Sequence, residues 1–408
     1  MTAASGRRDT GGAGVTAANA RRATGGAAVT ALPAALPGTE DHPHARMALA
    51  GALGAAGASH AYLFHGPPGS GKRTAARALA AELLAAGATD PENVRRRVAA
   101  GTHPDLTWVR PTGAHVMRVS DVEEPVVAAA GRTPFEAERR VFVLERVDTM
   151  NDEVANRLLK TLEEPPAFVH LVLLTDALGR VLETVVSRCQ SVRFDRLPAE
   201  RVARLLEADG VTPPRAAACA RLALGNVARA RELAGAEGDG LRDDVERLVS
   251  AVLGVAGDAG ADEPWRPLLA RADARRAAAE ARVKDEADAR LEWEPKGRDR
   301  RALERDFEEA GKRDGRRART EVLDLGLTLA ALTFRDLACL EEGVEEAVLA
   351  TDRAPALAAR APGRDPRRLR DAVERCEETR LSLELNPTEE LALSALVFRL
   401  EGLVGRSE

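Results

Sequence analysis

Short apolar runs alternate with helical patterns over residues 36–195. Each run has the length of a buried strand, and the stretches between them are rich in helix-forming residues. Strands that alternate with helices indicate a parallel sheet covered by helices on both faces. The predicted strands are residues 61–65, 106–109, 141–145, 169–174 and 191–194.

The chain beyond residue 195 carries helical patterns without predicted strands. Pro198 and the pair Pro213-Pro214 are helix-start signals, and they place a small helical region at 196–240. A larger all-helical region is expected at 241–408.

The larger helical region contains two kinds of helix. Residues 270–320 are densely charged and favour an extended, solvated helix pair. The segments 322–341, 365–385 and 387–403 carry apolar residues at spacings of three and four, as helices packed in a bundle do.

The first 35 residues are mainly Ala, Gly, Thr and Arg without periodicity, and we expect a disordered tail there. A second initiation near Val29 would leave a conventional domain start at about residue 36, and the sequence does not decide between these starts.

Charge and cysteine usage narrow the class of protein. The net charge of −5 gives no overall signal for binding nucleic acid or membranes, so a DNA contact would be local or through partners. The four cysteines, at 189, 219, 339 and 376, form no Cys-x-x-Cys pair, which argues against a zinc site and fits a reducing cytoplasm. No apolar run approaches the length of a membrane span.

A glycine-rich loop follows the first predicted strand. Residues 66–73 read Gly-Pro-Pro-Gly-Ser-Gly-Lys-Arg and lead into an Ala- and Leu-rich helical pattern. This order lets backbone N–H groups and the helix dipole face a phosphate. The phosphate-loop pattern requires Ser or Thr after Lys72, because that hydroxyl holds Mg²⁺, but Arg73 stands there and Thr74 follows. The sequence therefore predicts a phosphate cradle that has lost part of its metal site.

The third predicted strand ends in a second altered motif, Glu145-Arg146. In an active ATPase of this architecture these two positions are Asp, which orders the magnesium shell, and Glu, which polarises water. Glu145 is a poor substitute for the metal ligand, and Arg146 cannot act as a base because a guanidinium has no acceptor. Asp148 lies too far along the chain to replace them, and we expect it to be a helix N-cap.

Longer stretches of sequence resemble the clamp-loader branch of the AAA+ superfamily. Residues 156–166 read Asn-Arg-Leu-Leu-Lys-Thr-Leu-Glu-Glu-Pro-Pro, and residues 184–190 read Thr-Val-Val-Ser-Arg-Cys-Gln. His60-Ala61-Tyr62-Leu63-Phe64 and His103-Pro104-Asp105 add to the resemblance, which covers about 36–235. It implies an α/β fold class with three parts: an AAA+ P-loop base domain with a parallel sheet, a small helical lid domain, and an all-α collar domain for oligomerisation. Those parts correspond to residues 36–195, 196–240 and 241–408.

The resemblance also implies roles for single residues. Gly66, Gly69, Gly71 and Lys72 correspond to the phosphate loop, with Thr74 as the nearest hydroxyl. Glu145 and Arg146 stand at the metal and base positions.

Three further positions correspond to nucleotide-sensing and catalytic residues of the family. Thr175 matches the first sensor position, and Arg229 lies near the second. Arg188 matches the arginine that clamp-loader subunits offer to the ATP site of a neighbour. Many relatives insert a four-cysteine zinc module after the phosphate-loop helix, but residues 81–103 contain no cysteine, so we expect no zinc.

On this resemblance we expect a cytoplasmic subunit of a hetero-oligomeric ring that loads the sliding clamp onto primed DNA. It would be a component of a replicative DNA polymerase complex without ATPase activity of its own. It would bind ATP or ADP weakly if at all, without a well-formed place for Mg²⁺. Arg188 would act in trans, on ATP bound by a neighbouring subunit.

Two other readings stay open from the sequence. The chain could be an active ATPase motor subunit of the same loader, with Thr74 and Glu145 replacing the usual metal ligands. It could also be a regulatory AAA+ switch, outside replication, that binds nucleotide only to change shape. Purified-chain ATPase activity tests the first alternative, and co-purification with the clamp and motor subunits tests the second.

Overall fold

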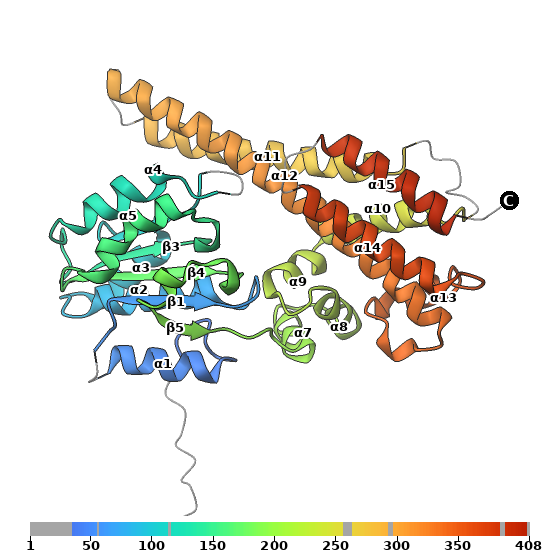
Figure 1. The fold of residues 1–408 in the computed structure, drawn as a ribbon, viewed down its shortest axis with the longest axis horizontal. Helices are drawn as coiled ribbons and strands as arrows, with labels where there is room; N and C mark the ends of the chain where they lie inside the picture. The colour runs from blue at the N-terminus through green and yellow to red at the C-terminus, as the bar shows by residue number, and fades with distance from the viewer. Residues whose placement is uncertain are drawn as a thin grey trace, which may run out of the picture.

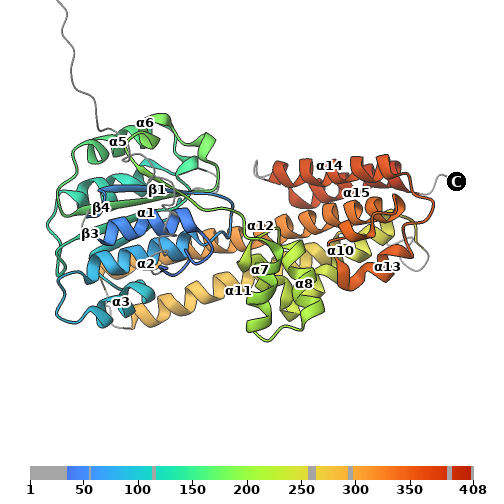
Figure 2. The same ribbon diagram turned by 90° about the horizontal axis from the view of Figure 1, so that it is seen from below.

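The computed structural model of the protein describes residues 35–54, 57–112, 116–255, 263–292, 297–383 and 388–405. The predicted tail lies outside these residues, apart from its last position. An α/β part and an elongated helical part lie next to each other along the long axis of the molecule (Figures 1 and 2).

The sheet has five parallel strands in the order β2-β3-β4-β1-β5. The strands are β1 (Ala61–His65), β2 (Leu106–Val109), β3 (Arg140–Leu144), β4 (Val169–Thr175) and β5 (Gln190–Arg193). All five predicted strands are present, with ends that differ by no more than one residue from the prediction. The predicted fold class, a parallel α/β sheet followed by all-helical regions, is confirmed.

Alternating side chains of the strands build a core on each face of the sheet. Tyr62 and Phe64 of β1 join the cluster beneath α1 (Pro43–Leu53), α2 (Lys72–Ala85) and α3 (Pro91–Ala100). Ala61 and Leu63 point to the opposite cluster. That second cluster is covered by α4 (Val119–Val122), the π-helix η1 (Glu123–Ala128), α5 (Asp152–Glu163) and α6 (Glu183–Val186). This two-sided burial explains why the central strands β1, β3 and β4 are largely apolar along their length.

Short helices complete the α/β part, and longer ones form the rest of the molecule. The short ones are the 3₁₀ turns η2 (Val147–Thr149) and η3 (Leu178–Arg180). The helices that follow β5 are α7 (Ala199–Ala208), α8 (Pro213–Leu222), α9 (Val227–Ala234), α10 (Ala236–Val252), α11 (Arg266–Leu291), α12 (Arg298–Glu341), η4 (Glu345–Ala347), η5 (Thr351–Arg353), α13 (Ala354–Ala358), α14 (Pro366–Ser382) and α15 (Glu389–Val404).

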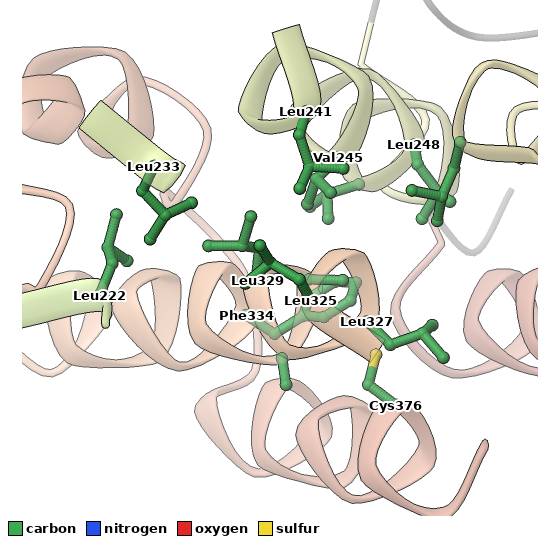
Figure 3. Packing of buried hydrophobic residues seen from close by; sticks show 14 of the residues in the cluster. Leu222, Leu233, Leu241, Val245, Leu248, Leu325, Leu327, Leu329, Phe334 and Cys376 are labelled. Carbon is green, nitrogen blue, oxygen red and sulfur yellow. The ribbon is translucent and has the colours of Figure 1, made fainter. Parts of the chain in front are cut away.

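The helices after β5 share one hydrophobic core. Leu222 and Leu233, from the region predicted to be a lid, belong to the same buried cluster as Val245, Leu329 and Phe334 (Figure 3). The region predicted to be a lid is therefore packed continuously against the later helices. The three-part division of the chain stays a prediction.

The charged segment forms a helical arm with α11 packed along the first half of α12 (Figure 1). The sequence placed a separate helix at 322–341, but that segment is the end of the single 44-residue helix α12. The helix is uninterrupted because no proline breaks it, and its glycines face α11. A Cβ on Gly315 would lie 2.6 Å from Oε1 of Glu280, so glycine allows the close approach of the two helices.

Asp105 connects the start of β2 to the segment before β3. Its buried carboxylate accepts hydrogen bonds from the backbone N–H groups of Phe135 (2.6 Å), Glu136 (2.9 Å) and Ala137 (3.0 Å). Burial by itself would raise the pKa of this carboxyl, but the three hydrogen bonds outweigh burial and hold its pKa below the ordinary value.

We expect Asp105→Ala to lower the free energy of unfolding by about 2–3 kcal/mol at pH 7, because three N–H groups lose their acceptor. Because the folded state lowers this pKa, the stabilisation is present above the unfolded carboxyl pKa of about 3.9 and is lost as the pH falls through the folded value. Urea unfolding of both proteins should therefore show a difference that narrows from pH 5 toward pH 3. The exposed Glu138→Ala is the matched control. A difference that is the same at both pH values would contradict this assignment.

Candidate functional site

The glycine-rich loop has the conformation that its sequence predicts. It connects β1 to α2, and Gly71 is the N-cap of α2. Gly66 and Gly69 have positive φ angles of 145° and 74°, where side chains are strained. A Cβ on Gly69 would also lie 2.0 Å from Oδ1 of Asn226, the residue that caps α9. The helical region that follows the sheet therefore rests directly on the loop.

The ammonium group of Lys72 is already bound by the protein. Lys72 is 6% exposed, and its Nζ donates to the carbonyls of Gly66 and Pro67 (2.7 Å) and contacts Oδ1 of Asp176 at 2.7 Å. Burial lowers the pKa of Lys72, and the Asp176 carboxylate opposes that shift. Because an ammonium has three protons, a phosphate would have to displace one of these partners.

The two altered motif positions are bound to each other. Arg73 Nη2 lies 3.0 Å from Oε1 of Glu145, which also accepts hydrogen bonds from Trp108 Nε1 (2.5 Å) and Arg110 Nε (3.3 Å). The Arg73 side chain is 58% exposed, whereas Glu145 is largely buried. Thr74 is exposed next to Gly38, since a Cβ on that glycine would lie 2.9 Å from Thr74 Cβ.

The backbone turns sharply after β3. Arg146 adopts a left-handed conformation (φ 55°, ψ 47°), and its carbonyl accepts hydrogen bonds from the N–H (2.9 Å) and hydroxyl (2.7 Å) of Thr149. The prediction that Asp148 is a helix N-cap is wrong. Asn151 is the N-cap of α5 and accepts a hydrogen bond from the N–H of Val154, whereas Asp148 lies within η2.

Asp148 instead binds the predicted first sensor residue. The Thr175 hydroxyl donates to Oδ1 of Asp148 at 2.8 Å, at the carboxyl end of β4. The register of the sheet pairs Thr175 with His65, the residue before the glycine-rich loop. Thr175, Asp176, Lys72 and Glu145 therefore gather at the carboxyl ends of β1, β3 and β4.

The predicted second sensor, Arg229, is engaged elsewhere. Its Nη2 lies 3.3 Å from Oδ2 of Asp324 in α12, and Oδ1 of that carboxylate binds Arg380 at 2.9 Å. Within the part of the chain that the structure describes, Arg229 forms no ion pair with the loop. Its role as a sensor stays a prediction.

Arg188 lies at the opposite end of the sheet from the loop. It comes just before β5, whose first residue, Gln190, pairs with Tyr62 of β1. The glycine-rich loop begins only after the far end of β1. Strands rise about 3.3 Å per residue, so the length of these strands, about 13–16 Å, separates Arg188 from the loop of its own chain. The Arg188 guanidinium donates to Thr184 O (2.8 Å) and Ser187 Oγ (3.3 Å) and is bound to the Glu163 carboxylate.

Comparison with known proteins finds relatives of the α/β part. A family model described as "DNA polymerase III, delta subunit" matches residues 42–198. Subunit delta' of DNA polymerase III from Bacillus subtilis is 37% identical over 180 residues. Subunit delta' from Pseudomonas aeruginosa is 41% identical over 137 residues. Residues 42–198 are therefore similar to delta-prime subunits of the clamp-loader family.

These similarities cover part of each protein. The match to the Bacillus relative spans 43% of this chain and 54% of that protein, and the match to the Pseudomonas relative spans 32% and 42%. Among solved structures, a DNA polymerase III gamma subunit-related protein from Thermotoga maritima aligns with 85% of this chain and 95% of that chain, at 16% identity and a TM-score of 0.39. No helix in the described ranges is long and apolar enough to cross a membrane.

The clamp-loader family implies a nucleotide and Mg²⁺ at the glycine-rich loop. The loop conformation fits a phosphate, but the ammonium protons of Lys72 are used by the protein. The metal does not fit, because a guanidinium stands where the metal-binding hydroxyl belongs and Glu145 is bound by three donors. The two altered motif positions, Arg73 and Glu145, therefore form an ion pair with each other where the motifs predict a metal site.

Sequence reasoning missed Asp176 and Trp108. Asp176 directly follows Thr175 after a buried strand, and adjacent parallel strands bring their carboxyl ends together, so its position could have indicated this contact. Trp108 lies on β2 and reaches Glu145 across the sheet register, a contact for which the sequence carries no signal.

We expect ATP at about 1 mM to raise the melting temperature of the purified chain by no more than about 1 °C, equally with Mg²⁺ and with EDTA. The reason is that each loop cation has a carboxylate partner, and a ligand present at its Kd contributes only about 0.4 kcal/mol. Asp176→Asn should increase the shift, because it releases the Lys72 ammonium, and adding Lys72→Ala should remove that gain. A shift of several degrees that requires Mg²⁺ would contradict the loss of the metal site.

Proposed function

We propose that this chain is a delta-prime-type subunit of a clamp loader, which presents Arg188 to ATP bound by a neighbouring subunit. The observation that supports this most is the position of Arg188. It lies at the end of the sheet opposite its own loop, partly exposed, so a phosphate that it binds would belong to another chain.

In this proposal the chain contributes one group to phosphoryl transfer. As the γ-phosphoryl group leaves, negative charge spreads over its oxygens, and an arginine fork can stabilise that charge from a neighbouring subunit. The subunit's own site takes no part, since Lys72 is paired with Asp176 and Arg73 with Glu145. Thr175, bound to Asp148, and Arg229, paired with Asp324, would then be structural rather than sensing residues.

The proposal includes partners that the family implies. The ring would contain tau or gamma subunits and delta, and it would act on the sliding clamp and primed DNA. The helical part has one continuous core, and its Asn226 lies against Gly69 of the loop, a connection between the two parts that suits a subunit held in a ring. The absence of zinc and the cytoplasmic location remain expectations.

The motor-subunit alternative requires magnesium-dependent turnover by the pure chain. We expect none above background, because Arg146 cannot position water as a base and Arg73 fills the metal position. Phosphate release from ATP by the purified chain should be measured with Mg²⁺, with the Lys72→Ala variant as the negative control. Turnover that this substitution abolishes would establish an active ATPase and refute the proposal.

The regulatory-switch alternative has no replication partners. Capture of the chain from its source cell, followed by identification of the bound proteins, distinguishes this alternative from the clamp-loader proposal. Recovery of the clamp-loader ATPase subunits supports the proposal, and their absence under conditions that recover other stable partners favours the switch.

Arg188→Ala should leave the fold and ring assembly intact but lower the DNA-stimulated ATPase rate of the reconstituted loader. Arginine fingers contribute about 10³–10⁵ in rate at a single dependent site, and the loss here should be smaller because other sites in the ring keep their own arginines. Arg188→Lys should restore little, because one ammonium cannot reproduce the planar fork.

The matched control is Arg157→Ala, an exposed arginine on α5 that pairs with Glu123. Gel filtration confirms assembly of each variant. Wild-type clamp loading by an intact Arg188→Ala ring would overturn the role in trans.

A further inference from the structure

Glu163 is the partner of Arg188 at the amino-terminal edge of the sheet. It is the last residue of α5, and its carboxylate binds Nη2 of Arg188. Both side chains are partly exposed, Arg188 at 33% and Glu163 at 48%. The contact joins two stretches of sequence that lie 25 residues apart.

A carboxylate at the carboxyl end of α5 does not stabilise the helix. The carboxyl end of a helix carries partial negative charge, so acidic residues there are unfavourable, yet α5 ends in Glu163 followed by Glu164. An ion pair this exposed also contributes little to folding, about 0–1 kcal/mol. The contact therefore calls for a reason other than stability.

The bonds to Arg188 leave one part of its guanidinium available. Thr184 O and Ser187 Oγ accept from Nη1, and Glu163 accepts from Nη2. A guanidinium has five N–H donors in a fixed plane, so Nε–H and one Nη2 hydrogen remain. Neither has an acceptor among the residues that the structure describes. Two N–H groups in one plane match the bidentate geometry of a phosphate.

We propose that Glu163 is a positioning residue, which holds the Arg188 guanidinium so that its free edge faces the neighbour's phosphate. This inference rests on the proposed function in trans. An arginine held in one orientation loses less freedom when it binds a phosphate, which favours the transition state over an unrestrained side chain. Glu163 stays bound to Nη2 throughout and does not have to be displaced.

The test uses the reconstituted loader with primed DNA, the clamp and ATP. Glu163→Ala should lower kcat for DNA-stimulated ATP hydrolysis by about three- to tenfold, with KM for ATP and the melting temperature unchanged, as expected when an interaction made in the transition state is weakened. Glu163→Gln, which keeps an oxygen acceptor, should recover part of the loss. Glu164→Ala is the matched control on the same turn and should behave as wild type.

The double variant Glu163→Ala, Arg188→Ala decides whether Glu163 acts through Arg188. We expect it to be no slower than Arg188→Ala alone, because the residue that Glu163 positions is then gone. Additive losses, a wild-type rate for Glu163→Ala, or a faster rate that reveals a restraining contact would each overturn the inference. If Arg188→Ala itself has no effect, the proposed function fails first, and the two failures are thus distinguishable.

Discussion

The parallel direction of the five strands determines where the charged groups of this domain can act. Every strand presents its carboxyl end to the same edge of the sheet, where the glycine-rich loop and the residues after β3 and β4 meet. The opposite edge receives the residues that precede the strands, among them Arg188 and the end of α5. One sheet therefore separates a phosphate loop from an arginine by the length of a strand. The functional groups of a single chain cannot combine into one site, whereas two neighbouring chains can supply one edge each.

Two ion pairs within the protein occupy the charged groups at the carboxyl ends of the strands. Lys72 binds Asp176 and Arg73 binds Glu145, each at 2.7–3.0 Å. In a metal-dependent nucleotide site such carboxylates and cations meet through Mg²⁺ and phosphate oxygens. Here Arg73 stands where the motif has a hydroxyl, and Glu145 stands where the second motif has a metal ligand. The two side chains bind each other directly. The two departures in the sequence are thus complementary, because the two altered side chains form an ion pair with each other.

The sequence predicted the features that depend on local pattern. The five strands follow from apolar runs, and the loop from its glycines and its place between strand and helix. The sequence could not predict contacts between side chains that are far apart along the chain. Which of the many basic and acidic residues pair depends on the fold, as in Lys72–Asp176, Arg229–Asp324 and Arg188–Glu163. The single helix α12 was also missed in part, because its charged half and its apolar half read as separate segments. Asp148 was misassigned because a cap depends on the residue at which the next helix begins, and that residue is Asn151.

The most direct test of a role in trans is a structure of the assembled loader with a slowly hydrolysed ATP analogue and primed DNA. The account predicts nucleotide in the loop of the neighbouring ATPase subunit, with the Arg188 guanidinium within hydrogen-bond distance, about 3 Å, of its γ-phosphate. It also predicts that the Arg73–Glu145 pair persists without a metal between the two side chains. Nucleotide and Mg²⁺ in the loop of this chain, with Arg188 turned to solvent, would contradict it.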